Sequence, residues 1–336
     1  MTRALLGLCL VLAGCATQPA RHESLFAGET MGSAWTVKLI GPLPHEADAL
    51  RDRVQARFDA VNLALSTYRA DSALSRFNAH DDGEWLDVDP ELAVVLRYAL
   101  SLGEASGGAY DVTVGPLVNL WGFGPDPSLW RVPEAAAIEA ARARVGWRKV
   151  EVDPVRARAR KAPGVRVDLS SLGKGRGVDR VAEYLDSLGI ANYLIDLSGK
   201  LRARGHNARG VAWRVAVERP GPDQPGMNVA IANSLVALSD ISIATAGDYR
   251  RYFESGGRHY SHIIDPATGY PVAHRTVSAT ALAAGCMQAD ALATVLMAMP
   301  PDAALSLANE RDIPALLIGR DDERLSAQPS AAWPAR

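Results

Sequence analysis

Helix-like and strand-like hydrophobic patterns alternate along this 336-residue chain, and that alternation limits the folds it can adopt. Residues 45–65 have the spacing of an amphipathic helix, whereas residues 34–40 alternate as a strand does. The helix is expected to bury one apolar face: Leu50, Val54, Phe58, Val61 and Leu65. Residues 211–218 and 229–238 have the alternation of antiparallel strands. The pattern predicts an α+β fold with a mixed, mainly antiparallel sheet and flanking helices, rather than a doubly wound parallel sheet.

Other segments add to this expectation. Further regular elements are expected at residues 90–106, 178–188 and 289–299 as helices and at 193–197 as a strand. Residues 165–169 should form a short strand, followed by a glycine-rich turn over residues 170–175. The sequence after Arg320 shows no regular period, so residues 321–336 are expected to form an irregular tail.

The first residues have the features of a bacterial lipoprotein signal rather than of a folded segment. Arg3 precedes an apolar run over residues 4–13 that is too short to span a bilayer, and Cys15 follows Leu-Ala-Gly. We expect residues 1–14 to be a signal peptide, Cys15 to carry lipid, and the protein to be a periplasm-facing lipoprotein of the bacterial cell envelope. An ordinary secretory signal with a chance cysteine is the alternative. Ala16 favours the outer membrane slightly over the inner membrane.

After this signal, we expect a polar tether over residues 15–24 and one domain over residues 25–320. If Cys9 leaves with the signal and Cys15 is lipidated, Cys286 alone remains, which excludes an intrachain disulfide and a zinc site built on cysteines. The net charge of −2 gives no sign of a nucleic-acid partner.

Asp290 and Thr294 are the first candidates for chemistry. A spacing of four residues on a helix places both on one face, and a carboxylate with a hydroxyl is an oxygen pair that suits Mg²⁺. The plainer alternative is an ordinary polar stripe in which the Thr294 hydroxyl donates to a backbone carbonyl. The spacing by itself favours the polar stripe, because such pairs are common on helices.

A glycine-rich run is the second candidate. Residues 168–179 read Asp-Leu-Ser-Ser-Leu-Gly-Lys-Gly-Arg-Gly-Val-Asp. Backbone N–H groups at such a helix start can bind phosphate, and Lys174 adds positive charge. The run is neither a Walker A loop nor a GxGxxG motif, so a generic glycine turn is an open alternative.

Two further turns carry polar side chains. Residues 261–269 place His262 three residues before Asp265, which suits acid–base work but also an ordinary Asp-Pro turn. Residues 107–111 follow a helix end and contain two glycines, so the backbone there can approach a ligand closely.

Taken together and in order, these motifs resemble those of the FAD:protein FMN transferases, the ApbE-like flavin transferases. The segments that carry the resemblance are residues 31–33, 65–72, 108–111, 121–124, 168–179, 244–249, 261–269 and 289–294. The resemblance covers residues 29–318, and the joint pattern is far more specific than any one motif. It implies a single compact ApbE-like, T-fold-related domain, and an exported enzyme that is often a lipoprotein.

The resemblance also implies roles for individual residues. Mg²⁺ would be bound by Asp290, Thr294 and the main-chain oxygen of Ser171. The FAD site would be lined by Met31, Tyr68, Ala109, Tyr110, Asp111, Asp168 and Lys174, with Ile264 packed on the flavin ring. His262 would lie near the flavin and the reacting phosphate, and we expect it, or Asp265 in second place, to be the base.

The implied reaction has FAD as its substrate and Mg²⁺ as its cofactor. FMN would be transferred to a threonine hydroxyl of a partner protein, and AMP would leave. The partner would be an acceptor flavoprotein subunit of a membrane electron-transport complex or an exported flavoprotein, with this enzyme held at the membrane by its lipid anchor. Two alternatives stay open: an FAD pyrophosphatase that gives AMP and FMN, and a flavin-binding lipoprotein without chemistry.

Some positions depart from the family pattern. Ser198-Gly199-Lys200 stands where Gly-Gly, often followed by an acidic residue, is usual. Ala246 stands where Ser is common, and Arg176 replaces a frequent aromatic residue. These departures bear on flavin affinity and catalytic rate more than on the fold.

Overall fold

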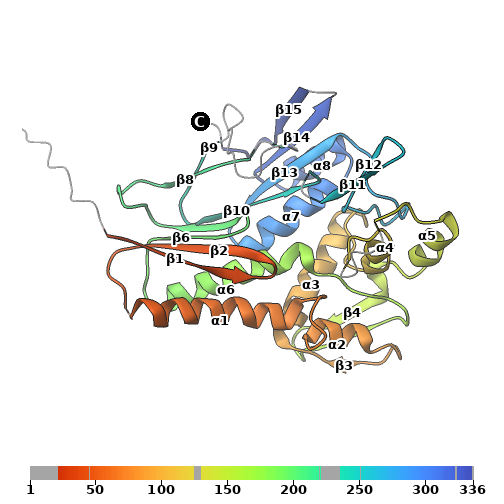
Figure 1. Cartoon of the computed structure of the whole chain (residues 1–336), viewed down its shortest axis with the longest axis horizontal. Coiled ribbons are helices and arrows are strands. Elements are labelled where there is room, and N and C mark those ends of the chain that lie inside the picture. Colours follow the sequence, from red (N-terminus) through yellow and green to blue (C-terminus); the bar gives the residue numbers. More distant parts are fainter. Residues whose placement is uncertain are drawn as a thin grey trace, which may run out of the picture.

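A sheet of eight strands lies at the centre of the computed structural model, which describes residues 22–44, 46–124, 130–218, 220, 235–249, 251–321 and 324–334 (Figure 1). The strands, in spatial order, are β1 (Glu23–Thr30), β2 (Ser33–Ile40), β6 (Tyr193–Leu197), β7 (Lys200–Arg204), β10 (Ile241–Gly247), β13 (Thr276–Ala283), β14 (Ala315–Asp321) and β15 (Arg324–Pro329). Each neighbouring pair runs antiparallel. The α+β prediction with a mainly antiparallel sheet is therefore confirmed.

Helices cover one face of this sheet. They are α1 (Ala47–Leu65), α6 (Ser170–Ser187), α7 (Cys286–Ala298) and α8 (Pro301–Glu310). Figure 1 shows α1 and α6 together below β1 and β2. Because side chains alternate along a strand, Trp35 and Val37 of β2 pack on these helices, whereas Ile40 packs on the opposite face. There β8 (Trp213–Ala216) and β9 (Leu235–Leu238) form a cover.

The remaining elements form two smaller clusters beside the sheet. One combines α2 (Ala73–Ala79), α3 (Pro90–Ala105), β3 (Leu86–Asp87), β4 (Val150–Asp153) and β5 (Arg158–Lys161). The other combines α4 (Gly115–Leu120), α5 (Ala135–Arg142), β11 (Tyr252–Ser255) and β12 (Arg258–Ser261). A short 3-10 helix (Trp147–Lys149) leads into β4.

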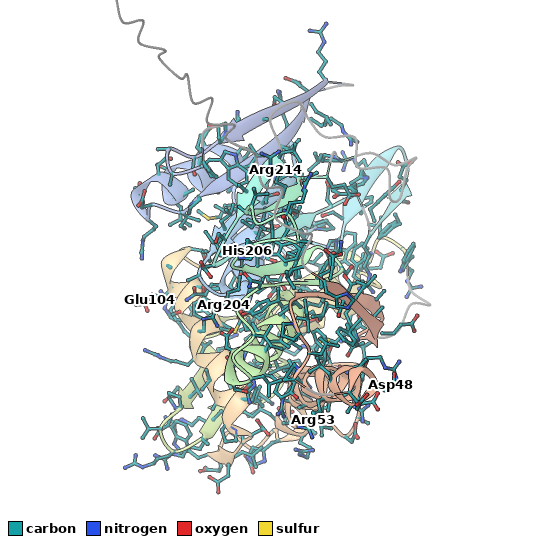
Figure 2. All side chains as sticks on the ribbon, turned by 90° about the vertical axis from the view of Figure 1, so that its left-hand side faces the viewer. Asp48, Arg53, Glu104, Arg204, His206 and Arg214 are labelled. Atoms are coloured by element: carbon teal, nitrogen blue, oxygen red, sulfur yellow. The ribbon has the colours of Figure 1, made fainter. Side chains whose placement is uncertain are left out.

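The sequence predicted helix α1 and its buried face correctly. All five apolar residues predicted for that face are buried. The outer face is polar, and its residues Asp48 and Arg53 are exposed at the surface of the molecule (Figure 2). The helices expected at 90–106 and 289–299 and the strand expected at 193–197 are also present, as α3, α7 and β6.

Two predictions about the glycine-rich run and its flank were wrong. Residues 165–169 are irregular, because Val167 pairs through its backbone with the Asn78 side chain instead of with a strand. Residues 170–175 are not a turn but the start of α6, where the Asp168 carboxylate accepts from the N–H of Ser170 at 2.8 Å.

The C-terminal tail was also predicted wrongly, because residues 324–329 form β15 on the edge of the sheet. Strand β8 is shorter than the predicted 211–218. Of the strand predicted at 229–238, residues 235–238 form β9. Residues 229–234 lie outside the described residues, as do the signal peptide and Cys15. Glu23 and Ser24 of the expected tether belong to β1.

Two glycines in α6 allow close contacts with its neighbours, Gly175 with α7 and Gly177 with α1. A Cβ on Gly175 would lie 2.5 Å from the backbone oxygen of Cys286 and 2.8 Å from the Cα of Met287. A Cβ on Gly177 would lie 3.0 Å from the ring of Phe58. Glycine in a helix interior costs roughly 1 kcal/mol relative to alanine. That cost is tolerated here because the absent side chains let two helix backbones meet.

Two hairpin turns lie at one end of the sheet. Met31-Gly32 joins β1 to β2 with φ of 49° and 66°, and Ser198-Gly199 joins β6 to β7 with φ of 52° and 82°. Because Trp35 pairs with Leu197, both turns lie at the same end of their strands. Positive φ is strained for Met31 and Ser198, and such strain is common where a side chain must be aimed at a ligand.

The close contact of α6 and α7 gives a stability prediction. Gly175→Ala should lower the free energy of unfolding by about 1–3 kcal/mol, because the added methyl group meets backbone that cannot rotate away. Gly173→Ala is the matched control, since a Cβ there has no atom within 4 Å and should be neutral or stabilise by up to about 1 kcal/mol. Urea denaturation of both variants checks this, and equal effects would contradict it.

Candidate functional site

One cavity of about 1340 Å³ brings together nearly all the residues that the sequence singled out. Its lining includes Met31, Tyr68, Ala109, Tyr110, Asp111, Asp168, Ser171, Lys174, His262, Ile264, Asp290 and Thr294. The hairpin turns at residues 31–32 and 198–199 contribute to its rim. This volume exceeds that of most drug-sized pockets, so the cavity can hold a ligand of dinucleotide size.

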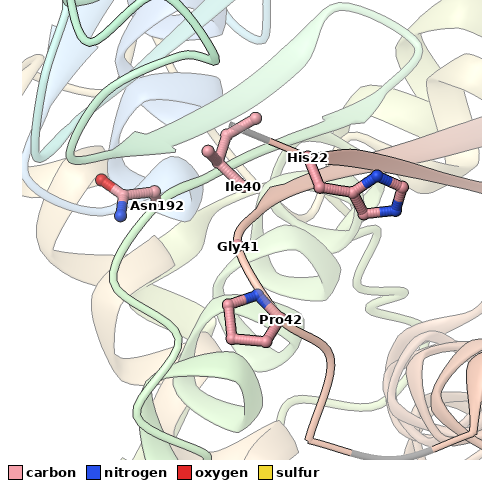
Figure 3. Close-up of a pocket in the computed structure, with 5 residues that line it drawn as sticks. All are labelled: His22, Ile40, Gly41, Pro42 and Asn192. Atoms are coloured by element: carbon pink, nitrogen blue, oxygen red, sulfur yellow. The ribbon is translucent and has the colours of Figure 1, made fainter. Parts of the chain in front are cut away.

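A second hollow lies at the opposite end of β2. It is lined by His22, Ile40, Gly41, Pro42 and Asn192 (Figure 3). None of the candidate residues reaches it, and His22 is the one ionisable side chain among the five. The large cavity is therefore the candidate site.

Asp290 is the buried charge at the floor of the cavity. Its side chain is 4% exposed, and its two carboxylate oxygens have different partners. Oδ2 accepts from the N–H of Gly175 at 3.1 Å, and Oδ1 lies 3.2 Å from Nζ of Lys200. Burial raises the pKa of Asp290 above its ordinary value, while the Lys200 charge and the Gly175 N–H act in the opposite direction.

Thr294 and Ser171 place two neutral oxygens near this carboxylate. The Thr294 hydroxyl donates to the backbone oxygen of Asp290 at 3.1 Å, which is the bond that the plainer interpretation expected. Since its proton is used there, its lone pairs are available on the cavity side. In a regular helix the N–H of Gly175 points to the carbonyl oxygen of Ser171, four residues earlier. Asp290 Oδ2 accepts from the same N–H, so the Ser171 carbonyl oxygen and Asp290 Oδ2 lie close to each other.

These oxygens fit a hard divalent cation. The set combines one carboxylate, one hydroxyl and one backbone carbonyl, which are ligand types that Mg²⁺ accepts. Within the described part of the chain, no group of three or more His, Cys, Asp or Glu residues could hold a metal. The donor set therefore suits an ion that keeps waters or takes substrate oxygens, rather than a fully protein-caged metal.

His262 faces the cavity from the loop after β12. Its Nδ1 lies 3.1 Å from the backbone oxygen of Arg251, which can only accept, so Nδ1 carries the proton and Nε2 is the acceptor. Burial lowers the pKa of His262 to about 4, helped by the nearby charges of Arg251 and Lys200. The imidazole is therefore neutral at pH 7, and Phe123 contacts it edge-on at 6.3 Å between ring centroids.

Asp265 is placed differently from the prediction, because it does not line the cavity. Oδ1 accepts from the N–H of Ala267 and Oδ2 from the hydroxyl of Thr268, each at 2.9 Å. Both oxygens thus stabilise the turn that follows, as an Asp-Pro turn does. The geometry gives His262, and not Asp265, access to a bound ligand.

Asp111 and Asp168 line the cavity but also hold its walls. Asp111 accepts from the Thr113 hydroxyl at 2.6 Å and from the Trp147 N–H at 2.8 Å. Burial raises the pKa of Asp111, and these donors act against that rise. Asp168 caps the start of α6. Their carboxylates therefore fix the positions of Ala109, Tyr110 and Ser171, and Tyr110 Oη lies 2.7 Å from Ser171 Oγ.

The mouth of the cavity carries Tyr68 and two cations. Tyr68 is 59% exposed, and its hydroxyl accepts from Arg251 at 3.4 Å. The loop that carries it is held by Ser72, which donates to the Ser66 carbonyl at 2.6 Å. Lys174 donates to the Ser33 hydroxyl at 2.9 Å. An aromatic ring and positive charges at a mouth suit a ligand with an aromatic group and phosphates.

The sequence interpretation missed several residues that position the site. Asp179 accepts from the backbone N–H groups of Cys286 at 2.7 Å and Met287 at 2.9 Å, so it caps the start of α7. Trp121 donates to the Gly269 carbonyl at 2.9 Å and stacks on Tyr260, which supports the loop of His262. Asp179 ends the glycine-rich run and Trp121 belongs to the 121–124 motif. Both residues therefore stand in motifs that the sequence revealed, but the sequence does not show which groups they contact.

The departures from the family pattern separate into two groups. Ser198, Lys200 and Ala246 line the cavity, so they contact whatever binds there. Arg176 does not line the cavity. It pairs with Glu91 of α3 and with Glu183 of its own helix at 2.9 Å, and it joins α6 to α3.

Comparison with known proteins gives a consistent result. Residues 31–317 match the model of the ApbE family. A Vibrio cholerae protein named FAD:protein FMN transferase is 41% identical over 325 residues, which are 96% of this chain and 95% of that protein. A protein of the same name from Klebsiella pneumoniae is 40% identical, over 95% of this chain and 92% of that protein. The solved structure of the flavin transferase ApbE from Vibrio cholerae superposes with a TM-score of 0.85 at 40% identity. The superposition covers 93% of this chain and 98% of that chain.

The environment of His262 gives a pH prediction. Its pKa is about 4 in the folded protein and about 6.5 in the unfolded chain, so the unfolded state binds more protons between these values. Stability should therefore fall as the pH decreases from 6.5 to 4, by about 1–3 kcal/mol more than in His262→Gln. Urea denaturation at each pH measures this difference, and an NMR titration of the imidazole checks the pKa. An imidazole that titrates near 6.5 would contradict the buried, neutral base.

Proposed function

The chain belongs to the ApbE family, and from this premise we propose that it is an FAD:protein FMN transferase. It breaks the diphosphate bond of FAD, joins FMN to a threonine hydroxyl of a partner protein and releases AMP. The observation that carries this proposal is the cavity in which Asp290, Thr294 and His262 lie together with the candidate FAD-lining residues. The shared name of the relatives supports the same activity.

The reaction exchanges one phosphoester partner for another. The threonine Oγ forms a bond to the FMN-side phosphorus, the P–O bond to the bridging oxygen breaks, and AMP leaves with that oxygen. Mg²⁺, when bound by Asp290, Thr294 and the Ser171 carbonyl, supplies charge that offsets the diphosphate and stabilises the departing phosphate. The protein's own contribution is mainly to hold the reacting groups in line.

His262 takes the proton of the threonine hydroxyl in this proposal. Its Nε2 is the unprotonated nitrogen, since Nδ1 donates to the Arg251 carbonyl. An imidazole with a pKa of about 4 is a weak base before substrate binds. A bound diphosphate places negative charge beside the ring and favours its protonated form, so substrate binding strengthens the base.

Tyr68 and Ile264 fit the flavin end of the substrate. Tyr68 offers an exposed ring at the mouth, and Ile264 offers a buried apolar surface next to His262. Lys174, at the start of α6, contributes positive charge for the phosphates, as does the helix N-terminus itself. In this proposal these residues orient FAD with its diphosphate toward Asp290.

We further propose that the protein is exported and held at the periplasmic side of a bacterial membrane by lipid on Cys15. The support is the signal-like sequence with its cysteine. No helix in the described ranges is long and apolar enough to cross a membrane. An anchored enzyme would meet acceptors that are themselves exported or part of membrane electron-transport complexes.

A transfer assay tests the proposed reaction. The protein is incubated with FAD, Mg²⁺ and a candidate acceptor peptide, and mass spectrometry detects addition of FMN to a threonine. Asp290→Ala should abolish this transfer at saturating FAD and Mg²⁺, because it removes the carboxylate of the proposed metal-binding set. Asp265→Asn is the matched control and should retain transfer, since Asp265 faces its own turn.

The same assay separates the alternatives. FAD alone should give slow release of AMP that the acceptor accelerates. Rapid release of AMP and unattached FMN without an acceptor would instead identify a pyrophosphatase. A stable FAD complex that reacts with neither water nor acceptor would identify a flavin-binding protein. Unchanged transfer by Asp290→Ala would remove the metal from the mechanism.

Lipidation is tested separately in a bacterial host. The full chain should take up a labelled fatty acid and sediment with membranes, whereas Cys15→Ser should do neither because it lacks the acylated thiol. Cys286→Ser is the control, as its thiol is buried in the fold. Fatty-acid labelling that survives in Cys15→Ser would contradict the anchor.

A further inference from the structure

The ion pair between Lys200 and Asp290 carries an inference that rests on the proposed function and goes beyond it. We propose that Lys200 is a built-in cation of the Asp290 site that competes with the divalent metal, so that it sets the metal affinity of this enzyme. The lysine must leave the carboxylate before a metal ion can bind there.

The pair is enclosed and specific. The side chains of Lys200 and Asp290 are 14% and 4% exposed, and Nζ lies 3.2 Å from Oδ1. Nζ also donates to the backbone oxygen of Thr245 at 2.5 Å. Two acceptors thus fix the ammonium group at the carboxylate, in contrast to the more exposed ion pairs of the surface.

The backbone aims this lysine at the site. Ser198 and Gly199 form the tight turn with positive φ, and Lys200 is the first residue after it. Strand pairing places Lys200 opposite Ala244, next to the Thr245 carbonyl that it contacts. Its position therefore follows from the sheet register and not from a flexible loop.

The two cations cannot both occupy this carboxylate oxygen. Oδ2 of Asp290 already accepts from Gly175, so Oδ1, which contacts Lys200, is the oxygen best placed for a metal. Like charges a few ångströms apart in a partly dry cavity repel strongly. Metal binding must therefore displace the ammonium group and break its bond to Thr245, and that cost weakens the observed affinity.

Direct metal binding tests this inference without FAD or acceptor. Mn²⁺ binding to the mature protein is measured by electron paramagnetic resonance at pH 8. The wild type is compared with Lys200→Met, which keeps the length and removes the charge, and with Lys200→Arg, which keeps a cation. Lys38→Met is the matched control, because it removes one charge from an exposed pair on β2 outside the cavity.

Lys200→Met should bind Mn²⁺ at least about tenfold more tightly than the wild type, as expected when a unit charge beside the ligand is removed. Lys200→Arg and Lys38→Met should stay near the wild-type affinity. In EDTA, Lys200→Met should also melt at a lower temperature than the wild type, because its buried carboxylate has lost a partner. Saturating Mn²⁺ should then raise its Tm by more than it raises that of the wild type.

Equal or weaker Mn²⁺ binding by Lys200→Met would overturn the competition and leave the transfer reaction untouched. Tighter binding by Lys200→Arg would overturn it too, because the charge would then not be the cause. If no variant binds Mn²⁺, both this inference and the metal in the proposed function fail. That outcome is distinguishable from a failure of FMN transfer, which the peptide assay reads independently.

Discussion

The contact between α6 and α7 is the interaction on which the site depends. Gly175 lets the two backbones meet, and its N–H donates to the carboxylate of Asp290. Asp179, one turn further along α6, accepts from the first N–H groups of α7. Three links between the same two helices therefore fix the direction of Asp290 and Thr294. A looser contact would remove the Gly175 donor from a buried carboxylate oxygen, which is costly.

Charge in the cavity is balanced locally rather than by the protein as a whole. The net charge of the chain is −2, so its overall field does not attract an anionic substrate. Instead, Lys174, Lys200 and Arg251 bring positive charge to the lining, and Asp290 is paired with Lys200. In the proposed reaction a diphosphate and Mg²⁺ would add opposite charges to this arrangement, and in our proposal Lys200 is the cation that moves away.

Hairpin turns of the sheet and two aromatic side chains position other residues of the cavity. Tight turns at residues 31–32 and 198–199 bring Met31 and Lys200 to the same end of the sheet. Trp121 and Phe123 support the loop that presents His262. Rigid backbone on both sides holds Asp290, Thr294 and His262 in one geometry, which the proposed phosphoryl transfer requires.

The sequence by itself determined the α+β class, the buried face of α1 and the candidate residues that, apart from Asp265, line the cavity. Periodicity is local, so Leu50 and Val54 reveal their helix without knowledge of any partner, and Asp290 and Thr294 reveal their shared face in the same way. The family motifs named residues that the fold then brought into one cavity. Only the tertiary structure decided the rest. Residues 170–175 begin α6 and Gly175 packs against α7, Asp265 turns away into its own loop, and Lys200 contacts Asp290. Such contacts join residues as far as 115 positions apart, as Gly175 and Asp290 show, and no local pattern specifies which distant group will satisfy a buried charge.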